Sequence, residues 1–554
     1  MSPALATAAQ LLALLGALAV AHRPLGDHLA AVYTSPRHLR VERWIYRAVG
    51  VDPDAETRWT GYLRALLVFS LTSVLALYAL ARLQDRLPLS EGAPPLSPDQ
   101  AFNTAVSFVS NTNWQSYAGE SAMGRLTQTA GLTVQNFLSA AVGMGVAVAL
   151  VRGFARSRTG TLGNFWVDLV RGTVRVLLPL SAVAALLLVA AGALQSLGPV
   201  QHLTTLTGDT QSLTPGAVAS QEAIKNLGTN GGGYFNANSA HPFENPDGLS
   251  NLLEIFLMLL IPCSLPRAFG LMVGSVRQGY AILAAMGVIW LAGVVLVTWI
   301  EYAHPGTAAQ AAGGAMEGKE QRFGPGASSL FAVTGTMTST GSVNASLDSF
   351  GALSGGVLLL GMMLGEVAPG GVGGGLYGML ILAVLAVFVA GLMVGRTPEY
   401  LGKRIGTREI TLAALYALVT PALTLGGTAL AVALPYGREA RGNTGAHGFT
   451  EVLYAYTSTS HNNGSAFAGL AADTPFLNTT LGLCMVLGRF LPIVLVLALA
   501  GALAGQRPHA TTAGTLRTDR PLFTGLLTGT TLILSGLTFF PALALGPLAE
   551  GLAS

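Results

Sequence analysis

The sequence predicts an all-helical polytopic membrane protein with about ten transmembrane helices, arranged as four pseudo-fourfold membrane–pore–membrane repeats around a central filter. The first observation is composition: 51% of the 554 residues are hydrophobic and only 10% are charged. A soluble globular protein has roughly 25% charged residues. The second is a series of long apolar segments, and the third is a polar, glycine-rich signature that occurs four times between them.

The apolar segments give the expected spans. We expect them at 3–22, 61–83, 126–151, 172–195, 249–275, 277–300, 350–395, 408–434, 476–504 and 521–546. No Lys or Arg precedes Arg23, so the first span is interpreted as a retained helix and not a signal peptide. The seventh span is too long for one straight helix. Its centre, 368–375, reads APGGVGGG, which predicts a broken or re-entrant segment.

Basic residues predict the orientation of the chain. Of the 30 Lys and Arg residues, 20 fall in the loops 22–60, 152–175, 265–279, 396–408 and 505–520. Because cytoplasmic loops carry the excess of Lys and Arg, these loops are predicted to be cytoplasmic. Ten spans then place both termini outside. The net charge of +3 is too small to suggest nucleic acid as a partner, so membrane lipid is the expected surrounding.

The four glycine-rich signatures define an internal repeat. They lie at 110–115, 228–233, 339–342 and 461–465, and each follows a moderately apolar stretch on the outer side. Aligned on Asn113, Gly231, Gly341 and Gly464, they are 118, 110 and 123 residues apart. The predicted division is 1–60 (extra helix and loop), 61–151, 172–275, 277–395 and 408–504 (repeats 1 to 4), and 521–546 (extra helix). So long a period favours an array around an axis, where a pore would lie.

Each signature is preceded by a short helix with its own start signals. Ser97-Pro98 and Thr214-Pro215 place a hydroxyl cap before a proline at the first helical position. A helix over 98–109 would be about 18 Å long, which crosses only half a bilayer. Such helices must re-enter the membrane, with the polar loop buried near its middle.

This arrangement predicts a cation site. A helix C-terminus carries about half a negative charge, and four of them would converge on one point. The polar signatures contain no Asp or Glu, so backbone carbonyls would be the ligands. Uncharged ligands suit a dehydrated monovalent cation, whereas calcium and magnesium normally require carboxylates. The alternative is four ordinary Gly/Asn turns, but turns do not need half-span helices leading into them.

Several longer motifs resemble one family. NTNWQSY at 111–117, GTNGGGYFNANSAHPFENP at 228–246, GEVAPGGVGGGLYGML at 365–380, GRTPEYLGKRI at 395–405 and NNGSAFAGL at 462–470 resemble the potassium-binding A subunit of the Kdp-type potassium-transporting ATPase. The resemblance covers about 3–546. It implies a bacterial inner-membrane complex with a P-type ATPase catalytic subunit, a single-span C subunit and a small peptide subunit, and K⁺ as the bound ion.

The resemblance also implies the filter positions. They are Asn111, Thr112 and Asn113; Thr229, Asn230 and Gly231; Ser339, Thr340 and Gly341; and Asn462, Asn463 and Gly464, with Gln115 adjacent to the first filter. The third triplet departs most from the family pattern.

Among the ionisable residues within the predicted spans, we single out Glu254, Glu366 and Arg489. A charge inside a membrane is costly, so it is usually paired or lines a water path. We hypothesise a gate around Glu366, Gly370 and Gly371, with Arg489 close enough to close the pore or repel cations. The sequence leaves an alternative equally open, in which Arg489 belongs to a structural salt bridge or extends its side chain to the membrane interface. Glu254 is expected to be structural or to line the vestibule.

No catalytic residues are predicted in this chain. GGGLYG at 373–378 matches GxGxxG only formally, because it lies in an apolar span. The sequence has no phosphate-binding GxxxxGK[ST], no HExxH and no phosphorylation sequence DKTGT. The chain is therefore interpreted as a non-catalytic subunit that binds K⁺ and transfers it to an ATPase partner. The alternatives are a free-standing potassium channel or symporter of the same superfamily, and a membrane-embedded enzyme or scaffold.

Overall fold

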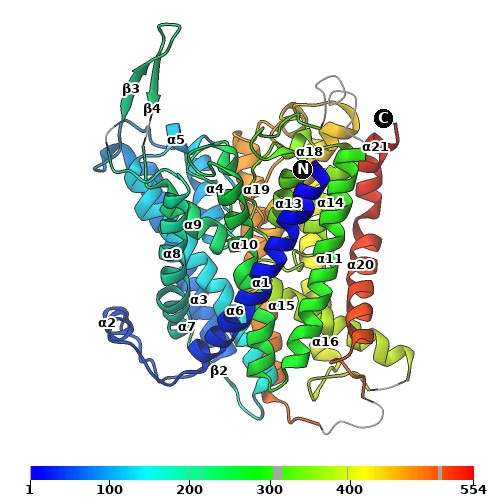
Figure 1. The fold of residues 1–554 in the computed structure, drawn as a ribbon. Helices are drawn as coiled ribbons and strands as arrows, with labels where there is room; N and C mark the ends of the chain where they lie inside the picture. Colours follow the sequence, from blue (N-terminus) through cyan, green and yellow to red (C-terminus); the bar gives the residue numbers. More distant parts are fainter. Residues whose placement is uncertain are drawn as a thin grey trace.

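The computed structural model describes residues 2–198, 200–213, 215–303, 315–395, 397–509 and 515–553. Within these residues ten helical segments are long and apolar enough to cross a membrane, as the sequence predicts. They are Pro3–Thr34, Trp59–Arg86, Thr127–Ala155, Phe165–Ala190, Gly248–Met272, Val276–Ala303, Gly374–Met393, Thr407–Ala433, Pro475–Gly505 and Pro521–Ala553. Both chain termini lie at the same end of the bundle (Figure 1).

The spans correspond to the following elements, given in chain order. The helices of the spans are α1 (Pro3–Thr34), α3 (Trp59–Leu83), α6 (Val134–Ala155), α7 (Phe165–Arg171), α8 (Leu178–Ala190), α10 (Gly248–Met272), α11 (Val276–Ala303), α15 (Gly374–Met393), α16 (Thr407–Ala433), α19 (Pro475–Gly505), α20 (Pro521–Leu543) and α21 (Ala549–Ala553). The first span is 12 residues longer than predicted. Arg23 and His28 lower the hydropathy there, but they are exposed on the helix surface and do not interrupt the helix.

Small residues allow the central helices to pack closely. On α6, Gly153 lies against the backbone of Ala500 on α19, and Gly143 lies against the carbonyl of Val372. A side chain at either position would overlap its neighbour. This use of glycine is typical of helix packing in membranes, where close backbone approach and not hydrophobic expulsion drives association.

Four short helices precede the four polar signatures. They are α4 (Pro98–Val109), α9 (Val218–Leu227), α13 (Gly324–Met337) and α18 (Gly445–His461). The predicted start of α4 is confirmed, since the Ser97 side chain accepts from the amide of Gln100. The predicted start at Thr214-Pro215 is wrong: α9 begins at Val218, and Thr214 lies outside the described residues. The segment before α9 is held outside the helix because Ser196 N donates to the Gly216 carbonyl.

The seventh span is broken, as its glycines predict. Helix α14 (Ala352–Met363) stops, residues 364–373 form a loop, and α15 continues. The backbone is left-handed at Gly365, Glu366, Gly370 and Gly373, a conformation that glycine adopts without strain. We refer to residues 364–373 as the break loop.

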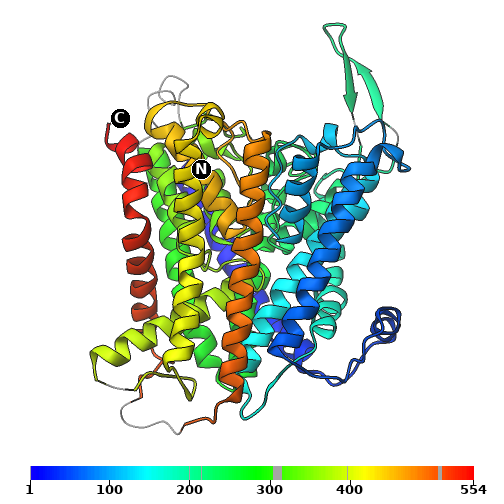
Figure 2. The ribbon, with the colours of Figure 1, turned by 180° about the vertical axis from the view of Figure 1, so that it is seen from behind.

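The remaining elements lie at the two ends of the bundle. They are α2 (Arg40–Val49), α5 (Gly119–Ala122), α17 (Pro435–Glu439), and the antiparallel pairs β1–β2 (Thr57–Arg58, Thr161–Gly163), β3–β4 (Gln201–Thr204, Thr210–Leu213) and β5–β6 (Glu399–Tyr400, Lys403–Arg404). The β3–β4 hairpin projects from the end that holds both termini (Figure 2). Helix α2 and β2 lie at the opposite end (Figure 1).

Candidate functional site: a ring of four loops

The four signature loops meet one another in a closed ring. A side-chain carbon added to Gly231 would strike the carbonyl oxygen of Thr340; one on Gly341 would strike that of Asn463, and one on Gly464 that of Thr112. The ring closes between the first two loops, where Asn111 Nδ2 donates to the Thr229 carbonyl at 2.8 Å. Segments more than 100 residues apart in sequence therefore share one centre.

The same backbone conformation recurs in all four loops. The first and third residues of each triplet have positive φ, and the middle residue does not. These pairs are Asn111 and Asn113, Thr229 and Gly231, Ser339 and Gly341, and Asn462 and Gly464, with φ between 47° and 100°. Alternating left- and right-handed residues turn successive carbonyls toward the same side of the chain. Four non-glycine residues in first position, all in a conformation that usually favours glycine, indicate that the surrounding structure enforces this geometry.

The middle residue of each triplet presents a free carbonyl. Among the described residues, no donor hydrogen-bonds to the carbonyl oxygens of Thr112, Asn230, Thr340 or Asn463. In three of the loops this oxygen faces the glycine of a neighbouring loop. Because buried carbonyls are almost always paired, four unpaired ones at equivalent positions point to a ligand.

The asparagine side chains are engaged in holding the ring together. Asn230 Nδ2 donates to Asn111 Oδ1 at 2.6 Å, Asn462 Nδ2 donates to Thr112 Oγ1 at 2.9 Å, and Asn463 Nδ2 donates to the Gly335 carbonyl at 3.0 Å. Asn113 Nδ2 similarly donates to Asn136 on α6. The amide nitrogens are thus engaged, and among the described residues the acceptors left are the backbone oxygens and the unpaired side-chain oxygens of Asn113 and Asn230.

Gln115 joins the first loop to the second. Its Oε1 accepts from the Gly233 amide at 2.9 Å, and it lies against Gly232. This contact connects the first loop of the ring to the second.

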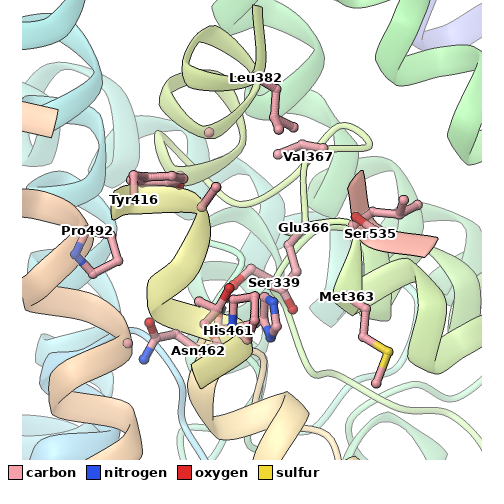
Figure 3. Close-up of a pocket in the computed structure, with 18 of the residues that line it drawn as sticks. Ser339, Met363, Glu366, Val367, Leu382, Tyr416, His461, Asn462, Pro492 and Ser535 are labelled. Carbon is pink, nitrogen blue, oxygen red and sulfur yellow. Dashed lines mark hydrogen bonds between the residues drawn. The ribbon is translucent and has the colours of Figure 1, made fainter. Parts of the chain in front are cut away.

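A cavity of about 100 Å³ lies between the ring and the break loop. It is lined by Ser339 and Asn462 of the ring, by Glu366 and Gly371 of the break loop, and by Arg489 of α19. Figure 3 shows Glu366 beside Ser339 and His461, with Tyr416 and Pro492 across the cavity. The break loop is tied directly to the ring: Gly370 N donates to the Met337 carbonyl at 3.0 Å, and Val372 N donates to Thr229 Oγ1 at 2.8 Å.

Glu366 and Arg489 share this cavity but form no ion pair within the described part of the chain. Arg489 Nη2 reaches only the Ser139 carbonyl, at 3.4 Å, and its Nε has no partner there. Glu366 Oε1 is likewise unpaired. Arg489 is 8% exposed and forms no salt bridge among the described residues.

Known proteins resemble this chain over nearly its full length. A sequence model of the potassium-transporting ATPase A subunit matches residues 12–552. The chain belongs to this family. The potassium-binding subunit of the potassium-transporting ATPase from Streptomyces coelicolor is 67% identical over 554 residues, all of both chains. The corresponding subunit from Mycolicibacterium smegmatis is 60% identical, again over both full lengths.

A solved structure shows the same fold. The potassium transporter TrkH from Vibrio parahaemolyticus superposes with a TM-score of 0.52 at 15% identity, covering 77% of this chain and 83% of that chain. This A-subunit family member is therefore a multi-pass membrane protein with the repeated membrane–pore–membrane fold.

One buried charged cluster, centred on Lys225, was not predicted from the sequence. In this A subunit, Lys225 is fully buried behind the second loop, and its Nζ contacts Glu222 at 2.7 Å, Glu244 at 2.9 Å and Asn238 Oδ1 at 2.9 Å. Asn238 in turn donates to the carbonyl of Gly232. Glu254, predicted to be structural or to line the vestibule, is buried near this cluster. The available signal was the Glu222–Lys225 spacing of one helical turn inside a helix expected at membrane depth.

Proposed function

We propose that this chain binds K⁺ at the ring of the four loops, as the non-catalytic subunit of an ATP-driven potassium uptake complex. The twelve residues of the four triplets form the filter, and their carbonyls replace the water shell of the ion. The observation that carries the proposal is the free middle carbonyl at four equivalent positions. The relatives named potassium-binding subunit support K⁺ as the ion.

The cavity below the ring would receive the ion next. The break loop, with Glu366, Gly370 and Gly371, lies on the far side of the cavity and would prevent straight passage. Arg489 would repel cations that arrive from that side. ATP hydrolysis would belong to a P-type catalytic subunit, and a single-span C subunit and a small peptide subunit would complete the complex.

The proposed location is the bacterial inner membrane with both termini outside. Both termini and the β3–β4 hairpin lie at one end of the bundle, while the arginine-rich segment around α2 lies at the other. The excess of basic residues favours the cytoplasm for the latter end.

The test is the potassium dependence of ATP hydrolysis by the assembled complex carrying Gly231→Asp. Gly231 has a φ of +79° and faces the Thr340 carbonyl, so the substitution adds strain, volume and charge at the ring. We expect the half-saturating K⁺ concentration to rise at least about tenfold, equivalent to roughly 1.4 kcal/mol. The matched control is Gly208→Asp, since Gly208 also has positive φ but lies in open space between β3 and β4.

Unchanged potassium dependence in Gly231→Asp would contradict the proposed filter. A potassium current through the purified chain alone, without ATP, would instead favour a free-standing channel.

A further inference from the structure

Helix α2 separates its apolar and basic side chains onto two different faces. The apolar face carries Val41, Trp44 and Val49, which are 44%, 68% and 47% exposed. Arg40, Arg43 and Arg47 are exposed on a second face, about 120° away around the helix. A ten-residue helix with an uncovered tryptophan and three exposed arginines needs a surface that offers both hydrocarbon and negative charge.

The orientation of α2 is fixed by its third face. Glu42 is fully buried, and its carboxylate contacts Arg175 at 2.5 Å and accepts from the Leu39 amide at 2.8 Å. Tyr46 is buried against Val167 and Val170 of α7. These contacts leave the apolar and basic faces directed away from the protein.

The position of α2 matches the surface of a bilayer. It follows the end of α1 at Thr34 by six residues and precedes the start of α3 at Trp59 by ten. Both views show α2 beside the helical bundle, and Figure 1 shows it at the level of α7 (Figures 1 and 2). Since α1 and α3 both cross the membrane, the helix between their ends is held where hydrocarbon meets headgroups.

We propose that α2 is an interfacial helix that binds the phosphate headgroups of anionic phospholipids. Trp44, Val41 and Val49 would enter the boundary of the acyl chains, and Arg40, Arg43 and Arg47 would contact the phosphates, which guanidinium groups bind in bidentate geometry. The charge of the three arginines favours an anionic lipid over a neutral one. This inference requires only that the chain spans a membrane, so it does not depend on the proposed potassium site.

The first test locates the two faces relative to the bilayer. The full chain, with Cys263 and Cys484 replaced by alanine, would carry one new cysteine, either Ala48→Cys next to the apolar face or Arg43→Cys on the basic face. Each variant would be labelled with an environment-sensitive fluorophore in lipid nanodiscs containing 30% phosphatidylglycerol. We expect quenchers attached near the top of the acyl chains to reach position 48 more strongly, and aqueous iodide to reach position 43 more strongly. Equal access of iodide to both positions would overturn the proposal.

The second test measures the contribution of charge. The Ala48→Cys label would be followed while phosphatidylglycerol is raised in a neutral lipid background, with and without Arg40→Gln, Arg43→Gln and Arg47→Gln. Loss of even one arginine contact should raise the anionic fraction needed for half-maximal lipid quenching about fivefold. The control variant carries Arg404→Gln, Arg408→Gln and Arg507→Gln, which replace exposed arginines outside α2. It should leave the anionic fraction for half-maximal quenching unchanged.

Two results would refute headgroup binding. One is the same dependence of quenching on phosphatidylglycerol for the triple variant and the parent, which would show apolar insertion alone. The other is protection of position 48 only in the assembled complex, which would assign the face to a protein partner.

Discussion

Replacing Lys225 by methionine tests whether the buried cluster behind the second loop holds the ring in shape. Lys225 is 0% exposed and touches two carboxylates, Asn238 and Ser239 at 2.7 to 3.0 Å. Lys225 is the cation among these contacts, and its removal leaves the carboxylates of Glu222 and Glu244 buried without a positive charge beside them. Breaking a buried ion pair in this way costs about 3–5 kcal/mol.

The loss of Lys225 should affect potassium binding through its contact with Asn238. Asn238 accepts from Lys225 and donates to the carbonyl of Gly232, which directly follows the second triplet. We therefore expect Lys225→Met to lower the thermal unfolding temperature of the purified complex and also to raise the half-saturating K⁺ concentration for ATP hydrolysis.

Lys319→Met is the matched control for this prediction. Lys319 is also buried and pairs with Glu301 at 2.8 Å, but none of its contacts is with a filter triplet. It should lower the unfolding temperature with little change in potassium dependence. If Lys225→Met and Lys319→Met shift potassium dependence equally, the link from Lys225 to the ring is refuted.

Three further predictions concern the outer surface, the packing and the break loop. His447 lies between Asp348 at 3.0 Å and Glu550 at 2.9 Å, and hydrogen bonds to these carboxylates raise its pKa to about 10. Because the pKa of His447 in the folded state is above the unfolded value near 6.5, the stabilisation by His447 is complete below pH 6.5 and is lost as pH rises through about 10. His447→Gln should therefore lower the unfolding temperature at pH 6, and the difference from the parent should vanish above pH 10. A difference that stays constant with pH would contradict this prediction. Gly153→Ala forces a methyl group against Ala500 and should cost about 1–3 kcal/mol in thermal unfolding, while Gly525→Ala, which meets open space, should be neutral. Arg489→Ala and Glu366→Ala should change potassium flux in reconstituted vesicles, and unchanged flux in both would end the gate hypothesis.

Local sequence features predict the architecture of this protein well. Ten spans, four short helices before the polar signatures and the broken seventh span all follow from hydropathy, proline and glycine within short windows. The division into six segments by residue number stays a prediction. The first span shows the limit of hydropathy, since the helix continues to Thr34 through polar residues that are exposed on its surface.

Contacts between distant residues could not be predicted in the same way. Lys225 meets Glu244 across 19 residues, and Arg175 meets Glu42 across 133, because the fold and not the sequence pattern brings them together. Helix α2 was predicted only as part of a basic loop, since ten residues with four charges fall below any hydropathy threshold. The filter positions came from family motifs, and no local pattern singled out their middle carbonyls.

The distribution of charge around the ring favours ions from one side. The ring itself is neutral, and the charges nearest to it above the break loop are partly compensated, with Lys225 between Glu222 and Glu244. Below the ring, Arg489 stands in the cavity without an ion-pair partner among the described residues. A cation at about 4 Å from another meets a repulsion of roughly 4 kcal/mol even at an effective dielectric constant of 20. Under the proposed function, an ion that leaves the ring would therefore encounter its largest electrostatic barrier at Arg489, so any onward route should pass this side chain at a distance or require its movement. Glu366 lies across the same cavity, so its charge state would determine the size of the electrostatic barrier at Arg489.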